Sequence, residues 1–398
     1  MLCAPFKGLR PVRGRESEVI APPYDVVNSA EAAQLAADRP YSFLHISHPE
    51  IDAREGADLY ATASEALANL SEQGVLARDS TACYYVYRIS TEDHVQTGVA
   101  LAASVDAYID NRIRKHEFTR PDKEDERAEH IDRLNAQTGP VLLVYAEQPQ
   151  LDTMLQTLAA VPPDMDALLV GVRHQVWVVR EAEQVRELDL ALNDLPAMYI
   201  ADGHHRSAAA ARVCERRQRG DASEYFLAVA FPHTQMNILD YNRVVTDLNG
   251  LSSDRFLERV GQRFGVMPEA EPVRPHRPRE FGLYLDAQWY RLVANDTDIS
   301  DDPVKGLDAS ILSDGLLAPI LGIHDPRRDA RIDFVGGARG LDGLQRRVDE
   351  GDMVAAFSLF PTPMEALMAV ADSGEVMPPK STWFEPKLAD GLLSYILE

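Results

Sequence analysis

The stretch that most constrains the fold is Tyr199-Ile200-Ala201-Asp202-Gly203-His204-His205-Arg206-Ser207-Ala208. The apolar residues 197 to 201 predict a short buried strand, Asp202-Gly203 predicts a turn, and the alanine-rich residues 207 to 212 predict a helix. Gly203 can adopt a left-handed backbone, and it lets a ligand approach the main chain closely. A helix N-terminus with His204, His205 and Arg206 offers donors that suit a phosphate. A capped turn, with Asp202 bonding the helix N–H groups, is the structural alternative.

Length and composition limit the classes of protein that this sequence can represent. The 398 residues, 45% hydrophobic and 26% charged, are typical of a globular protein of two or three domains. A formal net charge of -23 repels nucleic acid and anionic lipid, and no apolar run is long enough to span a membrane. The three cysteines are too far apart in the sequence to predict a disulfide framework or a thiolate metal site. We therefore predict a soluble cytoplasmic protein with a small-molecule partner and no nucleic-acid or membrane partner; the oligomeric state stays open.

A second informative stretch runs from Lys115 to Asn135, and Pro121 is suited to the first position of a helix within it. At 3.6 residues per turn, the basic side chains of this helix share one face, while the acidic ones occupy the others. The basic face is formed by Arg120, Lys123, Arg127 and His130. Such sorting in an acidic protein indicates an anion site. Salt bridges along the helix surface are the alternative.

Two acidic residues are candidates for proton transfer. Glu117 follows His116, but a zinc peptidase motif needs a second histidine at position 120, which is Arg120 here, so that class is excluded. Asp25 follows Pro22-Pro23-Tyr24, where successive prolines hold the backbone extended and present Tyr24 and Asp25 at a fixed place. Asp25 could equally cap the helix expected from residue 30.

The remaining pattern predicts an α+β fold with mixed sheets and packed helices. Residues 41 to 46 alternate like a strand, and residues 334 to 337 read as a turn. Asn237 follows the strong strand predicted at 226 to 231, a common place for ligand contacts and for turns alike. Lys380 lies in a proline-framed loop that could close over an anion. The composition shifts after Leu248, which predicts a core over residues 1–248 and a C-terminal α+β region over residues 249–398.

Several runs together resemble one family of bacterial and archaeal proteins, the domain of unknown function 1015 (DUF1015), over almost the whole chain. The resemblance is carried by Pro5-Phe6-Lys7-Gly8-Leu9-Arg10, Pro22-Pro23-Tyr24-Asp25-Val26-Val27, Lys115-His116-Glu117-Phe118-Thr119-Arg120, the 202–206 turn, Ile332-Asp333-Phe334-Val335-Gly336-Gly337 and Met377-Pro378-Pro379-Lys380-Ser381-Thr382. The Asp202-Gly203-His204-His205-Arg206 run also resembles the phosphate-binding signature of the ParB/sulfiredoxin superfamily. In the free serine kinases of that group, the matching segment holds nucleotide phosphates.

The resemblance implies a ParB/sulfiredoxin-like phosphate-binding core and phosphoryl transfer from ATP, ADP or pyrophosphate to a small hydroxylated metabolite, with free L-serine giving O-phosphoserine. Gly203, His204, His205 and Arg206 would hold the donor, and Lys123, Arg127 and His130 would meet the same phosphates or the carboxylate of the acceptor. Glu117 is the first candidate proton acceptor and Asp25 the second, and Asp202 is a candidate Mg²⁺ ligand. Two other classes stay open. One is a metal-dependent hydrolase using His116, Glu117, His130, His204 and His205; the other is a non-catalytic protein that binds a nucleotide or a phosphorylated metabolite.

Overall fold

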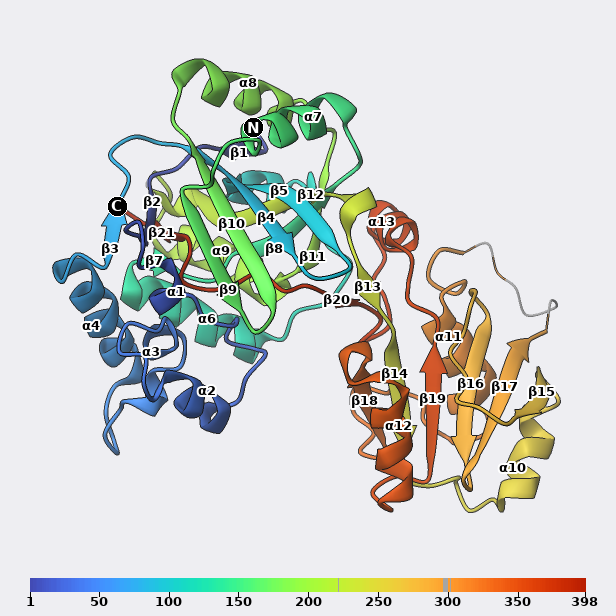
Figure 1. Cartoon of the computed structure of the whole chain (residues 1–398). Coiled ribbons are helices and arrows are strands. Elements are labelled where there is room, and N and C mark those ends of the chain that lie inside the picture. Colours follow the sequence, from blue (N-terminus) through green and yellow to red (C-terminus); the bar gives the residue numbers. More distant parts are fainter. Residues whose placement is uncertain (221, 296–299, 301) are drawn as a thin grey trace. The chain divides into compact units, whose positions relative to one another are not determined.

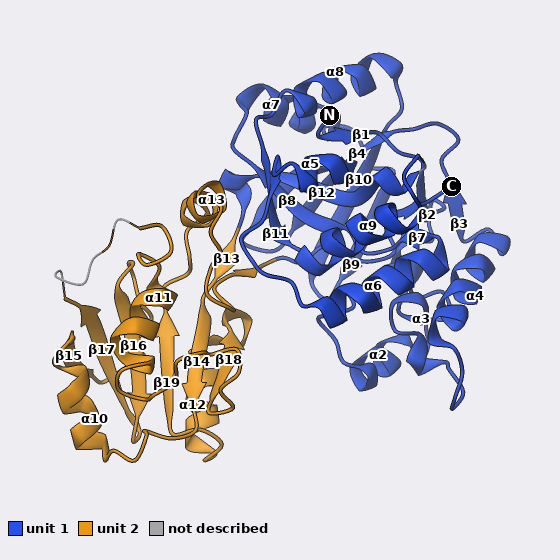
Figure 2. Ribbon diagram, turned by 180° about the vertical axis from the view of Figure 1, so that it is seen from behind, with its two compact units in different colours: residues 1–236, 386–398 blue, residues 237–385 orange. Residues whose placement is uncertain are grey.

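The computed structural model describes residues 1–220, 222–295, 300 and 302–398. It divides into two compact units, shown in Figure 2: unit 1 comprises Met1–Met236 and Pro386–Glu398, and unit 2 comprises Asn237–Glu385. The division differs from the boundary expected after Leu248. Strand β14 (Tyr241–Val245) pairs with β18 (Ile332–Gly336) and β19 (Ala355–Leu359) of unit 2. Residues 386–398 return to unit 1 and supply strand β21 (Ser394–Ile396).

Unit 1 is built on a nine-stranded mixed sheet, counted over the described residues (Figure 1). Its strands, in spatial order, are β6 (Ile113–Arg114), β11 (Met198–Asp202), β8 (Val141–Tyr145), β12 (Tyr225–Pro232), β5 (Val95–Ser104), β4 (Tyr84–Ser90), β10 (Val172–Val179) and β9 (Met165–Leu169), with β1 (Cys3–Ala4) paired to β5. A smaller sheet contains β3 (Leu76–Arg78), β2 (Gly8–Pro11), β21 and β7 (Ala136–Gln137). Strand β8 is buried along its whole length, which explains its continuous apolar sequence.

The helices of unit 1 pack their apolar residues against these sheets. They are α1 (Glu16–Val19), α2 (Ser29–Ala36), α3 (Leu44–Ser47), α4 (Leu59–Glu72), α5 (Val105–Ile109), α6 (Pro121–Leu134), α7 (Pro149–Leu158), α8 (Ala182–Asn193) and α9 (His204–Arg216). In α9 the small residues Ala208 and Ala210 join the core of the main sheet, so the helix lies close to the strands. The mixed sheets and packed helices confirm the predicted α+β class.

The strand–turn–helix predicted around Gly203 is present as β11, a turn and α9. Gly203 has a φ angle of 96°, which side chains rarely tolerate, and a Cβ there would lie 2.9 Å from Nε of Arg206. The helix predicted after Pro121 is also present as α6, with Pro121 at its first position. The local signals at both stretches are therefore strong enough to determine their structure.

The strand expected at residues 41 to 46 is wrong, because the chain forms the short helix α3 there. Phe43, Leu44 and Ile46 are all fully buried, so the apolar residues do not mark one face of a strand. The capping box of α2, in which Asn28 and Glu31 exchange hydrogen bonds, shows that Asn28 caps that helix instead of Asp25. Asp25 is left exposed.

Unit 2 has a six-stranded sheet, counted over the described residues, and a separate two-stranded pair. The sheet order is β15 (Phe264–Glu269), β17 (Gln288–Ala294), β16 (Glu280–Leu285), β19 (Ala355–Leu359), β14 and β18 (Ile332–Gly336); the pair is β13 (Ile238–Leu239) with β20 (Trp383–Phe384). Helices α10 (Ser253–Val260), α11 (Asp308–Leu312) and α12 (Gly340–Asp349) pack with it, and unit 2 also contains α13 (Met364–Asp372). The turn expected at residues 334 to 337 is wrong. Gly336 ends strand β18, where a Cβ would lie 2.7 Å from the Trp383 ring, so the glycine permits close packing.

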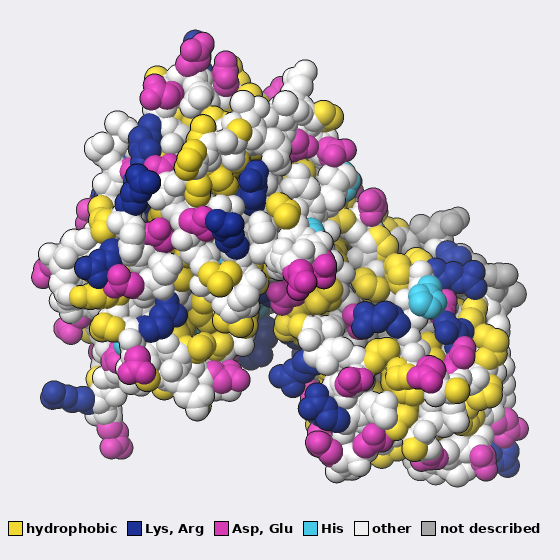
Figure 3. Space-filling view, viewed as in Figure 1, with side chains coloured by type: hydrophobic (Ala, Val, Ile, Leu, Met, Phe, Trp, Pro, Cys, Tyr) yellow, Lys and Arg dark blue, Asp and Glu magenta, His cyan; other side chains and the backbone are white. Residues whose placement is uncertain are grey.

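Charged side chains of both signs are interspersed on the face of the molecule in Figure 3. Among the described helices, none combines the length and apolar character needed to cross a bilayer. Because the charges are mixed, the anion site expected in this acidic protein requires a local arrangement of cations. Unit 1 contains such an arrangement of cations.

Candidate functional site

Arg206 is the central residue of the candidate site. It lies in the first turn of α9, and its side chain folds back over Gly203. The residue is 9% exposed, and its Nε–H has no hydrogen-bond partner among the described residues. Nη1 donates to the carbonyl of Pro140, and Nη2 lies 3.6 Å from the Asp202 carboxylate. A buried guanidinium with an unused donor is suited to accept an anion.

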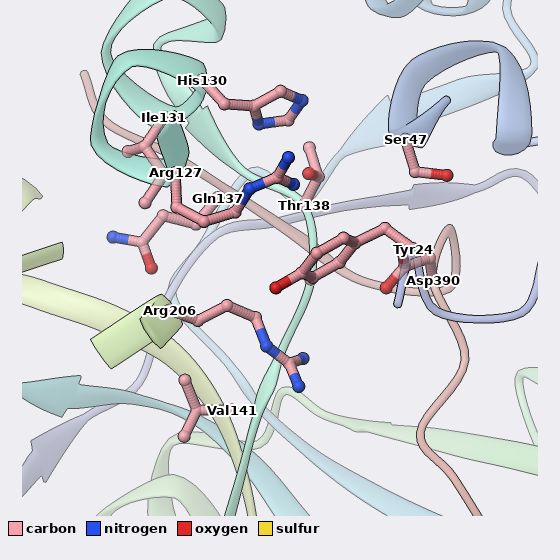
Figure 4. A pocket seen from close by; sticks show the side chains of 11 residues that line it. Tyr24, Ser47, Arg127, His130, Ile131, Gln137, Thr138, Val141, Arg206 and Asp390 are labelled. Carbon is pink, nitrogen blue, oxygen red and sulfur yellow. The ribbon is translucent and has the colours of Figure 1, made fainter. Parts of the chain in front are cut away.

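Tyr24 brings Arg206 together with Arg127 of α6. The guanidinium carbons of Arg127 and Arg206 lie 4.2 Å and 6.0 Å from the centroid of the Tyr24 ring. Figure 4 shows both arginine side chains extending toward Tyr24 in a pocket, which we call the phosphate pocket. It is lined by Tyr24, Ser47, Arg127, His130, Ile131, Gln137, Thr138, Gly139, Val141, Arg206 and Asp390. The two cations, held by one aromatic ring, form a ready position for a phosphate group.

The C-terminal segment of unit 1 supplies two further charged groups. Asp390 is held by paired backbone hydrogen bonds with Ala21, and it lines the phosphate pocket. Burial raises the pKa of Asp390 to about 7, although Arg206 opposes the shift. Nζ of Lys387 lies 3.2 Å from Oδ2 of Asp202. Sequence reasoning missed both residues, because the only signal near them is the Asp390-Gly391 turn before an apolar strand.

Asp202 is neutralised by its neighbours. Burial opposes its charge, but the attraction of Lys387 and then of Arg206 holds the pKa of Asp202 well below its usual value. Its Oδ1 accepts a hydrogen bond from the N–H of Gly203, and Oδ2 faces Lys387. These contacts fit a structural part in the turn, the alternative given by the sequence, and the role of Asp202 as a Mg²⁺ ligand stays a prediction.

His116, Glu117 and His204 meet in a second group, which we call the histidine cluster. Nδ1 of His204 lies 3.9 Å from Oε2 of Glu117, and the rings of His116 and His204 are perpendicular with centroids 4.5 Å apart. Burial lowers the pKa of His116 to about 4. Burial, and then the proximity of His116, hold the pKa of His204 well below its usual value. Both imidazoles are therefore neutral near pH 7.

The other residues predicted for the basic face are arranged differently. His130 lines the phosphate pocket, whereas Arg120 and Lys123 are exposed and pair with Asp122 and Glu126 of their own helix. Burial lowers the pKa of His130 to about 4. The alternative of a helix stitched by salt bridges thus describes Arg120 and Lys123. Arg127 also pairs with Glu126, at 2.6 Å, but it lines the pocket together with His130.

His205 is half-buried in α9, and burial lowers its pKa. Asp25 is exposed, and its carboxylate interacts electrostatically with Arg206 and Asp390. Asn237 and Lys380 belong to unit 2. There the carbonyl of Asn237 accepts a hydrogen bond from the N–H of Glu385, and the Lys380 ammonium lies 5.7 Å from the centroid of the Tyr241 ring.

Comparison with solved structures finds distant similarity. A free serine kinase in complex with AMP is 13% identical, with a TM-score of 0.39 over 78% of this chain and 94% of that chain. SbnI with a C-terminal truncation from Staphylococcus aureus is 13% identical, with a TM-score of 0.40 over 75% of this chain and 87% of that one. A conserved hypothetical protein from Pyrococcus furiosus is 13% identical, with a TM-score of 0.36 over 77% and 98%.

Comparison with families of sequences is more specific. No curated protein matches the sequence significantly. The sequence profile of the family described as "Protein of unknown function (DUF1015)" matches residues 3–310. That range contains the Asp202 turn, Arg127, Tyr24 and the histidine cluster, and it makes up well over half of the sequence. The chain therefore belongs to the DUF1015 family.

Proposed function

We propose that the protein transfers a phosphoryl group from ATP, ADP or pyrophosphate to a small hydroxylated metabolite, and that the acceptor is free L-serine, which becomes O-phosphoserine. The observation that carries the proposal is the buried Arg206 guanidinium, whose Nε–H has no partner among the described residues and which shares the phosphate pocket with Arg127. Phosphoryl transfer asks a protein mainly to position the reactants and to neutralise charge on the moving group.

The residues around the pocket have distinct roles in this proposal. Arg206 and Arg127 bind the donor's phosphates, and the first N–H groups of α9, beside His204 and His205, bind the terminal phosphate. Gly203 leaves room for that approach. Asp202 holds Arg206 and Lys387 in place. Mg²⁺ enters with the phosphates of the donor, because phosphate oxygens are ligands that this ion prefers.

We assign the acceptance of the hydroxyl proton to Asp25. Its carboxylate is exposed and interacts electrostatically with Arg206, so it lies close to the proposed phosphates without being consumed by an ion pair among the described residues. A general base must reach the proton of the attacking hydroxyl within hydrogen-bond distance. Glu117 is the other candidate, but it lies beside His204 in the histidine cluster and does not line the phosphate pocket.

The sequence of the turn also supports the proposal. Asp202-Gly203-His204-His205-Arg206 resembles the segment that holds nucleotide phosphates in free serine kinases. The rival class, a non-catalytic sensor of a nucleotide or phosphorylated metabolite, would use the same pocket. It predicts binding without turnover.

Phosphorus NMR tests the proposal directly. Purified protein with Mg²⁺ and L-serine is incubated separately with ATP, ADP and pyrophosphate. We expect a growing phosphomonoester signal in one tube, which also identifies the donor. If no donor is consumed while nucleotide still binds, the sensor class replaces the enzyme.

The matched control lies on the same helix. Arg216 of α9 is partly exposed and pairs with acidic residues of α6, at 3.7 Å from Asp125 and 3.8 Å from Glu129. Arg206→Ala should abolish the phosphomonoester signal, whereas Arg216→Ala should retain it. Equal loss in the two variants would show that the effect comes from the helix and not from the pocket.

A further inference from the structure

The histidine cluster is not used by the proposed phosphoryl transfer. One nitrogen of His116, one nitrogen of His204 and one carboxylate oxygen of Glu117 all lie within 4.8 Å of one another. The two histidines are 2% and 6% exposed, while the Glu117 side chain is 48% exposed. The group therefore has a buried base of two imidazoles and an acidic residue at the solvent side.

The hydrogen bonds of His116 show which of its nitrogens is available. The ring bonds to the carbonyl of Ile200, and Nδ1 has no partner among the described residues, so Nε2–H is the donor. This tautomer leaves a lone pair on Nδ1. A histidine that donates one ring N–H to a backbone carbonyl and presents the other nitrogen has the arrangement found in metal ligands.

His204 also has an unused ring nitrogen. Its Nε2 is buried and without a hydrogen-bond partner among the described residues, and its Nδ1 faces Glu117 at 3.9 Å. Two neighbouring buried imidazoles with unused nitrogens would destabilise the fold if nothing bound them. Native structures rarely leave buried ring nitrogens without a partner, so we expect the cluster to bind a ligand that accepts lone pairs.

We propose that His116, Glu117 and His204 bind a divalent transition-metal ion of the Zn²⁺ class. Two imidazole nitrogens and one carboxylate oxygen form a three-ligand set that leaves a coordination position open, as catalytic zinc sites do. Nitrogen ligands favour such ions over Mg²⁺, which prefers oxygen. The proposed site differs from the Mg²⁺ site that the sequence predicts at Asp202, both in its ligands and in its metal.

The inference stands apart from the proposed function, because metal binding is measured without nucleotide or serine. Metal-free full-length protein is titrated with ZnCl₂ by calorimetry, and separately with CoCl₂ by visible absorption, which reports the coordination of the ion. We expect one equivalent of Zn²⁺ to bind, and an equal concentration of MgCl₂ not to displace it. Absence of stoichiometric Zn²⁺ binding would overturn the proposal, whether or not phosphoryl transfer is observed.

Variants assign the ligands. Glu117→Gln removes a half-exposed carboxylate and should lower Zn²⁺ affinity by about tenfold or more. His116→Ala should remove stoichiometric binding. The control is His94→Ala, which changes a histidine in the loop between β4 and β5 that contacts Gln96 and lies outside the cluster. If circular dichroism shows that His116→Ala does not fold, the Zn²⁺ affinity of Glu117→Gln is the deciding measurement. Wild-type affinity in Glu117→Gln would then exclude the cluster as the site.

Discussion

The guanidinium of Arg206 lies directly over Gly203, so that a Cβ at residue 203 would be 2.9 Å from Nε and 3.1 Å from Cζ. Gly203 is therefore required twice, once for its φ angle of 96° and once for the space that Arg206 occupies. The glycine and the arginine form one unit, in which the backbone conformation sets the position of the charge.

Gly203→Ala tests this relationship. We expect the free energy of unfolding to fall by about 1–2 kcal/mol from backbone strain alone, and nucleotide affinity to fall because Arg206 must move. Gly74→Ala is the control, since Gly74 also has a positive φ, 68°, but nothing lies within 4 Å of its Cβ position. Urea unfolding should show a lower free energy of unfolding in both variants. Calorimetry should show weaker nucleotide binding only in Gly203→Ala. Unchanged binding in Gly203→Ala would separate the glycine from the position of Arg206.

Arg206→Ala should weaken the binding of a phosphate ligand by about 2 kcal/mol or more, which is roughly thirtyfold in Kd. The reason is the loss of a charged hydrogen-bond donor in a buried pocket. Arg206→Lys keeps the charge but not the forked geometry, so its loss should be intermediate. Calorimetry with ADP measures both, with Arg216→Ala as the reference. Affinity equal to that of the reference in Arg206→Ala would remove Arg206 from the binding site.

Asp390 should make phosphate binding depend on pH. Its pKa of about 7 means that the carboxyl is neutral below pH 7 and becomes an anion in the pocket above it. A bound phosphate should keep the carboxyl protonated, so affinity should fall about fivefold between pH 7 and pH 8 and should approach a tenfold fall per pH unit above that, where binding takes up one proton. Asp390→Asn should remove this part of the dependence and bind more tightly than the wild type at pH 8. The ratio of the two affinities, measured from pH 5.5 to pH 8.5, cancels the titration of the ligand itself. A constant ratio would contradict the prediction.

Asp25→Asn should lower turnover by about 10²–10⁴-fold with little change in nucleotide affinity, because it removes the proposed proton acceptor but no phosphate contact. Single-turnover phosphorus NMR and calorimetry measure the two effects separately. Glu117→Gln serves as the comparison. If it abolishes turnover with full occupancy of metal and donor while Asp25→Asn is active, the proton goes to Glu117, as the sequence first indicated.

The parts of the site that the sequence predicts are those fixed by neighbours along the chain. Gly203 and the apolar run before it determine the turn locally, and the 3.6-residue period places Arg127 on the inner face of α6. The ion pairs of the first turn of α6 are not all fixed by neighbours along the chain. Glu124 pairs with Arg212 of α9 at 2.5 Å, a contact between residues far apart in sequence that no local pattern contains.

The remaining parts depend on contacts across the whole of unit 1. Tyr24, Arg127, Arg206 and Asp390 come from four distant segments, and only the folded sheet brings them to one pocket. The boundary between the units also depends on contacts between segments that are distant in the sequence. The composition shift after Leu248 does not coincide with this boundary, because strand pairing assigns β14 to unit 2 and β21 to unit 1.

The return of residues 386–398 to unit 1 has a consequence for synthesis on the ribosome. Asp202 and Arg206 are made about 180 residues before Lys387 and Asp390, and all of unit 2 is translated in between. Until residues 386–398 have been synthesised, Asp202 lacks the lysine that pairs with it, and the smaller sheet of unit 1 lacks strand β21. The phosphate pocket therefore cannot be complete until residues 386–398 have been synthesised and have folded back onto unit 1.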